Sequence, residues 1–295
     1  MGHIPCSGNT TCKEGEPGVI YSCEPDGTNL PVGTCDTDLA CSLGRCVSKS
    51  CATAELQASI AGCLFYTAVL DNVDTDDGKP TLIVVTNPGP TTATVELEER
   101  GAGSPWATAQ AISVQPGLAD SFSVVVPAVA ASAADASSGP SRPVARRVIS
   151  DAPVTVMLVQ SDNADGTATS SSGTFVLPAH ALGMRYMVMA YQQRATDKVQ
   201  RLAGSRGGAQ EIAIVATQDR TTLWVYAPSP VPNAMPRTVT LDADGDVYPL
   251  TTTQDNDDLS GSFIVSDKRV AVFSGNVATT NPFPLAGYSD GCLVT

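Results

Sequence analysis

Three aspartates at alternate positions, Asp242, Asp244 and Asp246, surround a glycine in the segment LDADGDVY. Their carboxylate oxygens have the spacing of the first ligands in a calcium-binding loop, because calcium prefers several hard oxygen ligands. The glutamate that would close a helical calcium loop is absent, since position 253 is Thr253. An Asp-Gly pair between two strands is also a common hairpin turn, and the sequence favours that turn here. Calcium is therefore the one candidate cofactor, with residues 71–80 as a weaker second site.

Catalytic chemistry has little support in the residue types present. The chain has 2 histidines, and only His180 lies in the part expected to fold, inside LPAHALG, where a turn explains it. A hydrolase triad needs a base, and no G-x-S-x-G, H-E-x-x-H or phosphate-binding glycine loop occurs. The 30 acidic residues make some carboxylate pair inevitable, so such a pair is not specific for a glycosidase. The sequence predicts a protein that is not an enzyme, with a secreted carbohydrate-active enzyme as the alternative.

A basic loop is the candidate binding segment. Residues 192–209 carry four cations against the single acid Asp197 on an otherwise acidic chain. The four cations are Arg194, Lys198, Arg201 and Arg206. We interpret this loop as a contact surface for a partner, and a plain solvated loop is the other interpretation.

Cysteines are concentrated in the first fifth of the chain, which has few large apolar residues. The eight that cluster there are Cys6, Cys12, Cys23, Cys35, Cys41, Cys46, Cys51 and Cys63. Such a segment cannot build a packed core and is expected to depend on disulfides, which indicates an oxidising, extracytoplasmic compartment. A zinc module is disfavoured because no C-x-x-C pair occurs. The connectivity of eight cysteines cannot be read from the sequence.

Charge and hydropathy exclude further classes of partner. The formal net charge of -13 disfavours nonspecific binding to nucleic acid or anionic lipid. The sequence shows neither a signal peptide nor a run of about 18 apolar residues that would span a membrane. Since disulfides require export, we expect the chain to be a mature or excised piece of an exported protein, truncated at its C-terminus, where Cys292 stands alone.

Beyond Cys63 the sequence predicts short apolar strands separated by turn residues, and several of its sequence motifs occur twice. RRVISDAPVTVMLVQS at 146–161 matches SGSFIVSDKRVAVFSGN at 260–276, and IVVTN at 83–87 aligns with IVATQ at 214–218. A hairpin with one solvent-exposed face is predicted for the segment TLIVVTNPGPTTATVELEERG. The Ser-Asp pair of each copy is interpreted as a turn device whose aspartate binds backbone amides.

These patterns predict an all-β protein. We expect a small disulfide-rich module at residues 1–63, followed by two repeated antiparallel units at 64–180 and 181–295. The units are expected to be sandwich-like, with propeller-like blades as the alternative. The first copy is enlarged by an Ala/Ser/Pro-rich stretch, residues 127–143.

Two segments carry a family resemblance. LPAHALGMRY, Leu177 to Tyr186, and DLSGSFIVSDKRVAVFSG, Asp258 to Gly275, resemble the N-terminal domain of IgG Fc-binding proteins, as found in secreted mucin-associated proteins and exported bacterial ones. The similarity extends over most of residues 35–280. It implies an extracellular or cell-surface recognition or adhesion module that binds a protein or glycoprotein, with no catalytic residues. Antibody Fc is the partner named by the animal members.

Overall fold

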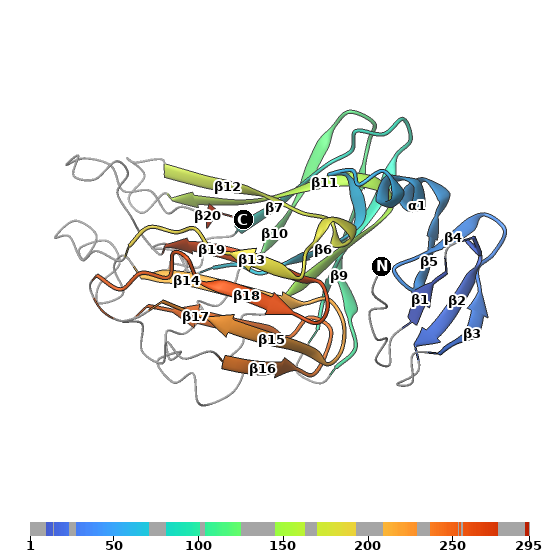
Figure 1. The fold of residues 1–295 in the computed structure, drawn as a ribbon. Helices are drawn as coiled ribbons and strands as arrows, with labels where there is room; N and C mark the ends of the chain where they lie inside the picture. Colours follow the sequence, from blue (N-terminus) through green and yellow to red (C-terminus); the bar gives the residue numbers. More distant parts are fainter. Residues whose placement is uncertain are drawn as a thin grey trace.

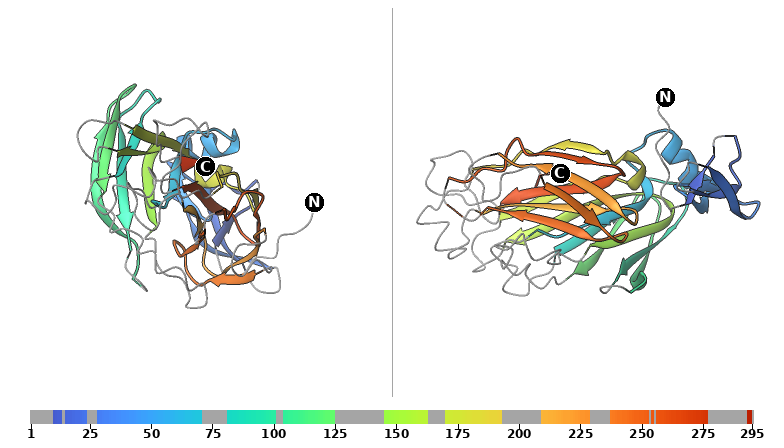
Figure 2. Two further views of the ribbon diagram at one scale, coloured as in Figure 1. Left: turned by 90° about the vertical axis from the view of Figure 1, so that its left-hand side faces the viewer. Right: turned by 60° about the horizontal axis from the view of Figure 1, so that its bottom comes forward.

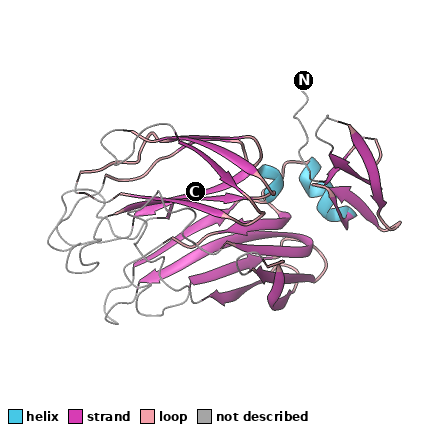
Figure 3. Cartoon of the chain, turned by 90° about the horizontal axis from the view of Figure 1, so that it is seen from below, coloured by secondary structure: helices cyan, strands magenta, loops and turns pink. Residues whose placement is uncertain are grey.

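Nearly all of the regular structure is β (Figure 3). The structure is a computed structural model that describes residues 10–13, 15–23, 28–70, 81–100, 104–124, 145–162, 170–192, 209–228, 237–252, 254, 256–276 and 293–294. Within these residues there are twenty strands and two short helices. The all-β prediction is therefore confirmed. No helix among the described residues is long and apolar enough to cross a membrane.

The N-terminal module lies at one end of the molecule (right in Figure 1) and consists of two small antiparallel sheets and a helix. Its elements are β1 (Thr10–Cys12), β2 (Val19–Cys23), β3 (Asn29–Thr34), β4 (Leu39–Ser42), β5 (Arg45–Ser48) and α1 (Lys49–Leu56). Ser48 caps α1, because its side chain accepts a hydrogen bond from the Cys51 amide.

Disulfides stabilise this module, as the sequence predicts. Among the described residues, three bridges join Cys12 to Cys41, Cys35 to Cys46 and Cys51 to Cys63. The module's own buried apolar cluster is small, so covalent links replace the missing core. The third bridge ties α1 to the first strand of the following unit. Cys6, Cys292 and the side chain of Cys23 lie outside the described residues.

The first β unit has two four-stranded layers that share one long strand. One layer has the order β6-β11-β8-β9 and the other β10-β7-β11-β12. The strands are β6 (Gly62–Thr67), β7 (Thr81–Thr86), β8 (Ala93–Glu99), β9 (Ala107–Val114), β10 (Ala119–Val124), β11 (Arg146–Asp162) and β12 (Ser170–Val176). The first half of β11 pairs with β6 and β8, and its second half with β7 and β12.

The second unit repeats this topology with β11 divided into two strands. Its layers have the orders β13-β18-β15-β16 and β17-β14-β19-β20. The strands are β13 (Arg185–Met187), β14 (Gln210–Ala216), β15 (Thr221–Tyr226), β16 (Arg237–Leu241), β17 (Val247–Thr251), β18 (Phe263–Ser266), β19 (Val270–Asn276) and β20 (Leu293–Val294). The repeat read from the sequence is thus a repeat of fold, and both units are sandwich-like.

The Ser-Asp phrase marks the point where the chain passes from one layer to the other. In the first unit the Asp151 Oδ1 atom accepts a hydrogen bond from the Thr94 amide, at 2.8 Å. In the second, Asp267 Oδ1 accepts from the Thr222 amide, also at 2.8 Å. Each aspartate therefore binds an amide of the neighbouring strand, β8 or β15, as predicted. The predicted turn is wrong in the first unit, because Ser150 and Asp151 lie within the continuous strand β11.

The predicted hairpin in TLIVVTNPGPTTATVELEERG is wrong. Its strands, β7 and β8, lie in opposite layers of the first unit, because each pairs with a different half of β11. Asn87 holds the connection by donating through Nδ2 to the carbonyls of Thr91 and Val114, each at 2.8 Å. The LDADGDVY turn likewise joins β16 to β17 in different layers and is not a hairpin.

The alignment of residues 83–87 with 214–218 is also corrected, by two residues. The Asn87 amide donates to the carbonyl of Leu118, and the Ala216 amide makes the equivalent bond to Asp246. Residue 87 therefore corresponds to residue 216. The even shift keeps the same side chains facing the core, which is why the alternation pattern could not detect it.

An apolar core continues from the first unit into the second. One buried cluster contains the interior of the first unit together with Ala213, Val215 and Phe273 of the second. Strand β14 is consequently buried on both faces. The second unit has its own core on the other side of β14, around Ile212 and Ile214. A 3-10 helix, η3 (Ala179–Ala181), lies between the last strand of one unit and the first of the next, and the boundary at residue 180 stays a prediction.

Candidate functional site

Each unit has a row of three directly opposed residues across neighbouring strands of one layer. In the first unit Tyr66 on β6 and Glu98 on β8 flank Arg147 on β11. In the second unit the corresponding positions hold Met187 on β13, Phe263 on β18 and Tyr226 on β15. Side chains in such a row lie on one face and contact one another. The same place in the fold therefore carries charged and polar groups in one unit and apolar groups in the other.

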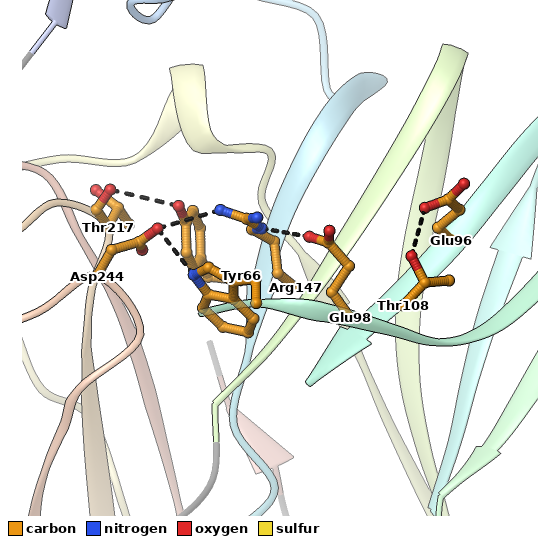
Figure 4. A network of polar contacts seen from close by, with 8 residues as sticks. Tyr66, Glu96, Glu98, Thr108, Arg147, Thr217 and Asp244 are labelled. Atoms are coloured by element: carbon orange, nitrogen blue, oxygen red, sulfur yellow. Dashed lines mark hydrogen bonds and ion pairs between the residues drawn. The ribbon is translucent and has the colours of Figure 1, made fainter. Parts of the chain in front are cut away.

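The first row is covered where the two units meet, with Tyr66 buried and Arg147 and Glu98 half-buried (Figure 4). Arg147 Nε donates to Glu98 Oε2 at 2.6 Å, and Arg147 Nη1 donates to Asp244 Oδ2 at 3.2 Å. The Tyr66 hydroxyl donates to the Thr217 carbonyl at 3.4 Å. Asp244 and Thr217 belong to turns of the second unit. The row therefore serves as the seat for the turns of a neighbouring β unit.

Close packing fixes the β16–β17 turn in this seat. Trp106 Nε1 donates to Asp244 Oδ2 at 3.1 Å, and Arg147 lies 4.6 Å from the centre of the Trp106 ring. Gly245 has φ +86°, and a Cβ atom there would overlap the Trp106 ring. Glycine is required both for this backbone conformation and for this approach. Arg100 pairs with Asp246 at 2.8 Å alongside.

Burial dominates the electrostatics of the seat. It raises the pKa of the Asp244 carboxyl to about 6, although the charge of Arg147 and the hydrogen bond from Trp106 lower it. Burial also raises the pKa of the Tyr66 phenol, with Asp244 adding to the shift. Burial lowers the pKa of the Arg147 guanidinium. The hydrogen bond to Glu98 and the charges of Tyr66, Glu98 and Asp244 outweigh this effect, so the pKa of Arg147 is raised overall. The three groups form one tightly coupled cluster.

The three predicted calcium ligands are not brought together as a metal site. The carboxylates of Asp244 and Asp246 are ion-paired with Arg147 and Arg100, and the backbone carbonyl of Asp242 accepts from an amide. No group of three or more potential metal-ligating side chains occurs in the described part of the chain. Calcium here would have to replace both arginines. The hypothesis stays a prediction, tested by whether millimolar calcium raises the melting temperature.

The other predicted sites fall in different places. Arg194, Lys198, Arg201 and Arg206 lie outside the described residues, as do residues 71–80. The contact role of that loop therefore stays a prediction. His180 lies in η3, where its Nε2 is 2.8 Å from the carbonyl of Ser59. Burial lowers the pKa of the His180 imidazole.

An exposed aromatic face is the site that the sequence interpretation missed. It consists of Met187, Trp224, Tyr226 and Phe263, with exposed fractions of 70%, 36%, 44% and 38%. The Tyr226 and Phe263 rings lie 6.4 Å apart. A signal was present, because Trp224 and Tyr226 alternate with buried residues in TTLWVY, whereas the first unit has Glu96 and Glu98 at the corresponding positions.

The chemistry of this aromatic face is that of a protein interface. A second row beside the first places exposed Arg185 opposite Val265, which is opposite Trp224. No acidic residue occurs in the two rows, although the chain has 30. Trp, Tyr, Phe, Met and Arg are the residue types enriched in interface cores, and contiguous exposed apolar patches mark interaction sites.

Comparison with known proteins finds one family model that matches part of the chain. No curated protein matches the chain. The crystal structure of Thermotoga maritima 1070 is similar at 12% identity over 39% of this chain and 91% of that one, with a TM-score of 0.26. The PBSX exported protein XepA is similar at 10% identity over 73% of this chain and 85% of that one, with a TM-score of 0.18. The model of the IgGFc binding protein family matches residues 172–290, so the family resemblance is confirmed for the segment that contains the whole aromatic face.

Proposed function

We propose that this chain is an extracellular recognition or adhesion module that binds a protein or glycoprotein through the aromatic face. The observation that carries the proposal is the exposure of the row Met187–Phe263–Tyr226. Its counterpart in the first unit is covered by turns of the second unit and forms a docking seat within the same chain. The disulfides and the family match support an extracellular, protein-binding role.

The docking seat of the first unit indicates how a partner would bind. There, a tight turn from a neighbouring β unit lies across the row, with charged groups on the seat meeting acidic groups on the turn. The second unit presents the same geometry with apolar side chains in place of the charges. A partner would therefore offer a projecting apolar turn or loop, with an acceptor for the guanidinium of Arg185. Buried aromatic anchors of this kind typically dominate binding energy.

Antibody Fc is the specific partner that we propose to test first. The family name supports this choice, and residues 172–290 are the matching segment. Mucin is the second candidate, because the resemblance includes mucin-associated proteins. Both are extracellular, and both would reach a face on the surface of the second unit.

The experiment measures binding of the oxidised chain to immobilised IgG Fc and to mucin. The double variant Trp224→Glu/Tyr226→Glu gives the second unit the acids that the first unit carries at these positions. We expect at least a 100-fold weaker binding, because two aromatic anchors worth about 2 kcal/mol each are lost. Phe175→Glu is the matched control, since Phe175 is 57% exposed on β12 of the other unit, and should bind like the unmodified chain.

The outcomes separate the face from the identity of the partner. Undiminished binding by the double variant, with its fold verified by circular dichroism, would contradict the proposed face. Binding to mucin and not to Fc, lost in the double variant, would support the face and reassign the partner. Concentration-dependent self-association that disappears only in the double variant would identify a second copy of the chain as the partner.

A further inference from the structure

A cavity of about 380 Å³ lies where the disulfide module and both β units meet. It is bordered by the β4–β5 turn, by β6 and by the turns of the second unit that dock on the first. Its charged lining consists of Arg45, Arg100, Arg147, Arg269, Asp219 and Asp244. The cavity is on different elements from the aromatic face, and its size is that of a small-ligand site.

The positive charge of this lining is only partly compensated. Arg147 is paired with Glu98 and Asp244, and Arg100 is paired with Asp246. Within the described residues, Arg45 and Arg269 make no ion pair. Two arginines thus remain available for an anion, on a chain whose net charge is -13.

The guanidinium of Arg45 has two neighbouring hydrogen-bond donors without a partner. Its Nε and Nη2 atoms are buried and have no hydrogen-bond partner. These two nitrogens form one edge of the guanidinium, and the edge matches two oxygens of a carboxylate, sulfate or phosphate. Burial lowers the pKa of Arg45, although the charge of Glu55, which forms no ion pair with it, raises that pKa. A buried unpaired donor pair is costly unless a ligand satisfies it.

The main chain around Arg45 is tightly constrained. Arg45 follows a tight turn in which Leu43 and Gly44 both have positive φ, 49° and 77°. A Cβ atom on residue 44 would overlap the backbone of Thr10, so the turn is packed against β1. The next residue, Cys46, is disulfide-bonded to Cys35. The main chain that carries Arg45 is therefore held in one conformation.

Other lining groups define what the anion would be attached to. Tyr66 and Trp106 supply aromatic walls, and Asp244 Oδ1 is a buried acceptor with no partner. A hydroxyl group on the ligand would satisfy that acceptor. The combination of an oxyanion, hydroxyl donors and a volume of about 380 Å³ describes a sugar-sized ligand.

We propose that this junction cavity binds an acidic sugar, whose carboxylate or sulfate occupies the Nε–Nη2 edge of Arg45 and whose hydroxyl donates to Asp244. The ligand would contact the disulfide module and both β units together. The site is independent of the protein-binding face and would give the molecule a second specificity.

Titration calorimetry on the oxidised full chain tests the site with glucuronate, glucose 6-sulfate, inorganic phosphate and glucose. We expect the two acidic sugars to bind, and glucose to bind at least tenfold more weakly. Arg45→Lys keeps the charge and removes the paired donors, so we expect a further tenfold loss for both acidic sugars. Arg185→Gln, at an exposed arginine on the aromatic face, is the matched control and should bind normally.

Each result decides the proposal. Equal binding of glucose and glucuronate, or undiminished binding by Arg45→Lys, would overturn it. Phosphate that binds as tightly as the acidic sugars would overturn the sugar and leave a simple anion site. The Trp224→Glu/Tyr226→Glu variant should retain sugar binding, so that failure of one site is distinguishable from failure of the other. Melting temperatures of the variants verify that they are folded.

Discussion

At the scale of single residues, Asp244 shows how burial and an ion pair compete. Its side chain is 22% exposed and pairs with Arg147, yet burial raises the pKa of the carboxyl to about 6, above the ordinary value of 3.8. The sequence singled out this residue as a possible calcium ligand, which stays a prediction, and the structure pairs its carboxylate with Arg147. Alternating aspartates indicate calcium equally well, and only the long-range contact with Arg147 distinguishes the two uses.

The pH dependence of stability tests which effect dominates. Because the folded-state pKa of Asp244 is raised, the folded state binds more protons than the unfolded state between pH 4 and 6. The stability contributed by Asp244 is therefore present below about pH 4 and is lost as the pH rises to about 6. Relative to Asp244→Asn, the free energy of unfolding should fall by up to about 3 kcal/mol over this range. Urea denaturation at each pH measures it, and a rise over the same range would show that the ion pair dominates.

At the scale of elements, the Ser-Asp crossing is the device that the two units share. The sequence predicted that each aspartate binds a backbone amide, but not that the amide lies on a neighbouring strand, 57 residues away for Asp151 and 45 for Asp267. The sheet assignment of β7 and β8 could not be predicted, because a turn such as Asn87-Pro-Gly-Pro fits both a hairpin and a passage between layers. What decides is pairing with β11, about 60 residues further along the chain.

The two crossings are expected to contribute equally. Asp151→Ala and Asp267→Ala should each lower the free energy of unfolding by about 1 kcal/mol, since each removes one hydrogen bond to a backbone amide. Asp38→Ala, at an exposed aspartate of the disulfide module, is the control and should change it by less than about 0.5 kcal/mol. Chemical denaturation of the three variants checks this. If only one of the two variants loses stability, the two units share a topology but are not stabilised in the same way at the crossing.

At the scale of the whole molecule, the two units are joined by a common core and differ in what covers their corresponding rows. The layered arrangement is visible in Figure 2, where strands of the first unit and strands of the second form adjacent layers. Strand alternation could predict that Trp224 and Tyr226 face away from their own core. It could not predict whether a neighbour covers that face, as it does in the first unit.

The shared core predicts cooperative unfolding. Phe273 of the second unit is 2% exposed and belongs to the cluster that includes the interior of the first unit. Differential scanning calorimetry with intact disulfides should therefore show one transition for both units. Phe273→Ala should lower its temperature without splitting it, at a cost of about 3–5 kcal/mol. Two separate transitions in the unmodified chain would contradict the shared core.

The most direct test of the account is oxidative footprinting of the chain with and without the partner that the binding panel identifies. Met187 is 70% exposed in the aromatic face, whereas Met157 lies on β11 of the other unit and provides an internal control. Saturation with the partner should slow oxidation of Met187 at least fivefold and leave Met157 unchanged. Equal oxidation of Met187 in the free and bound chain would place the binding surface elsewhere and contradict binding through the aromatic face.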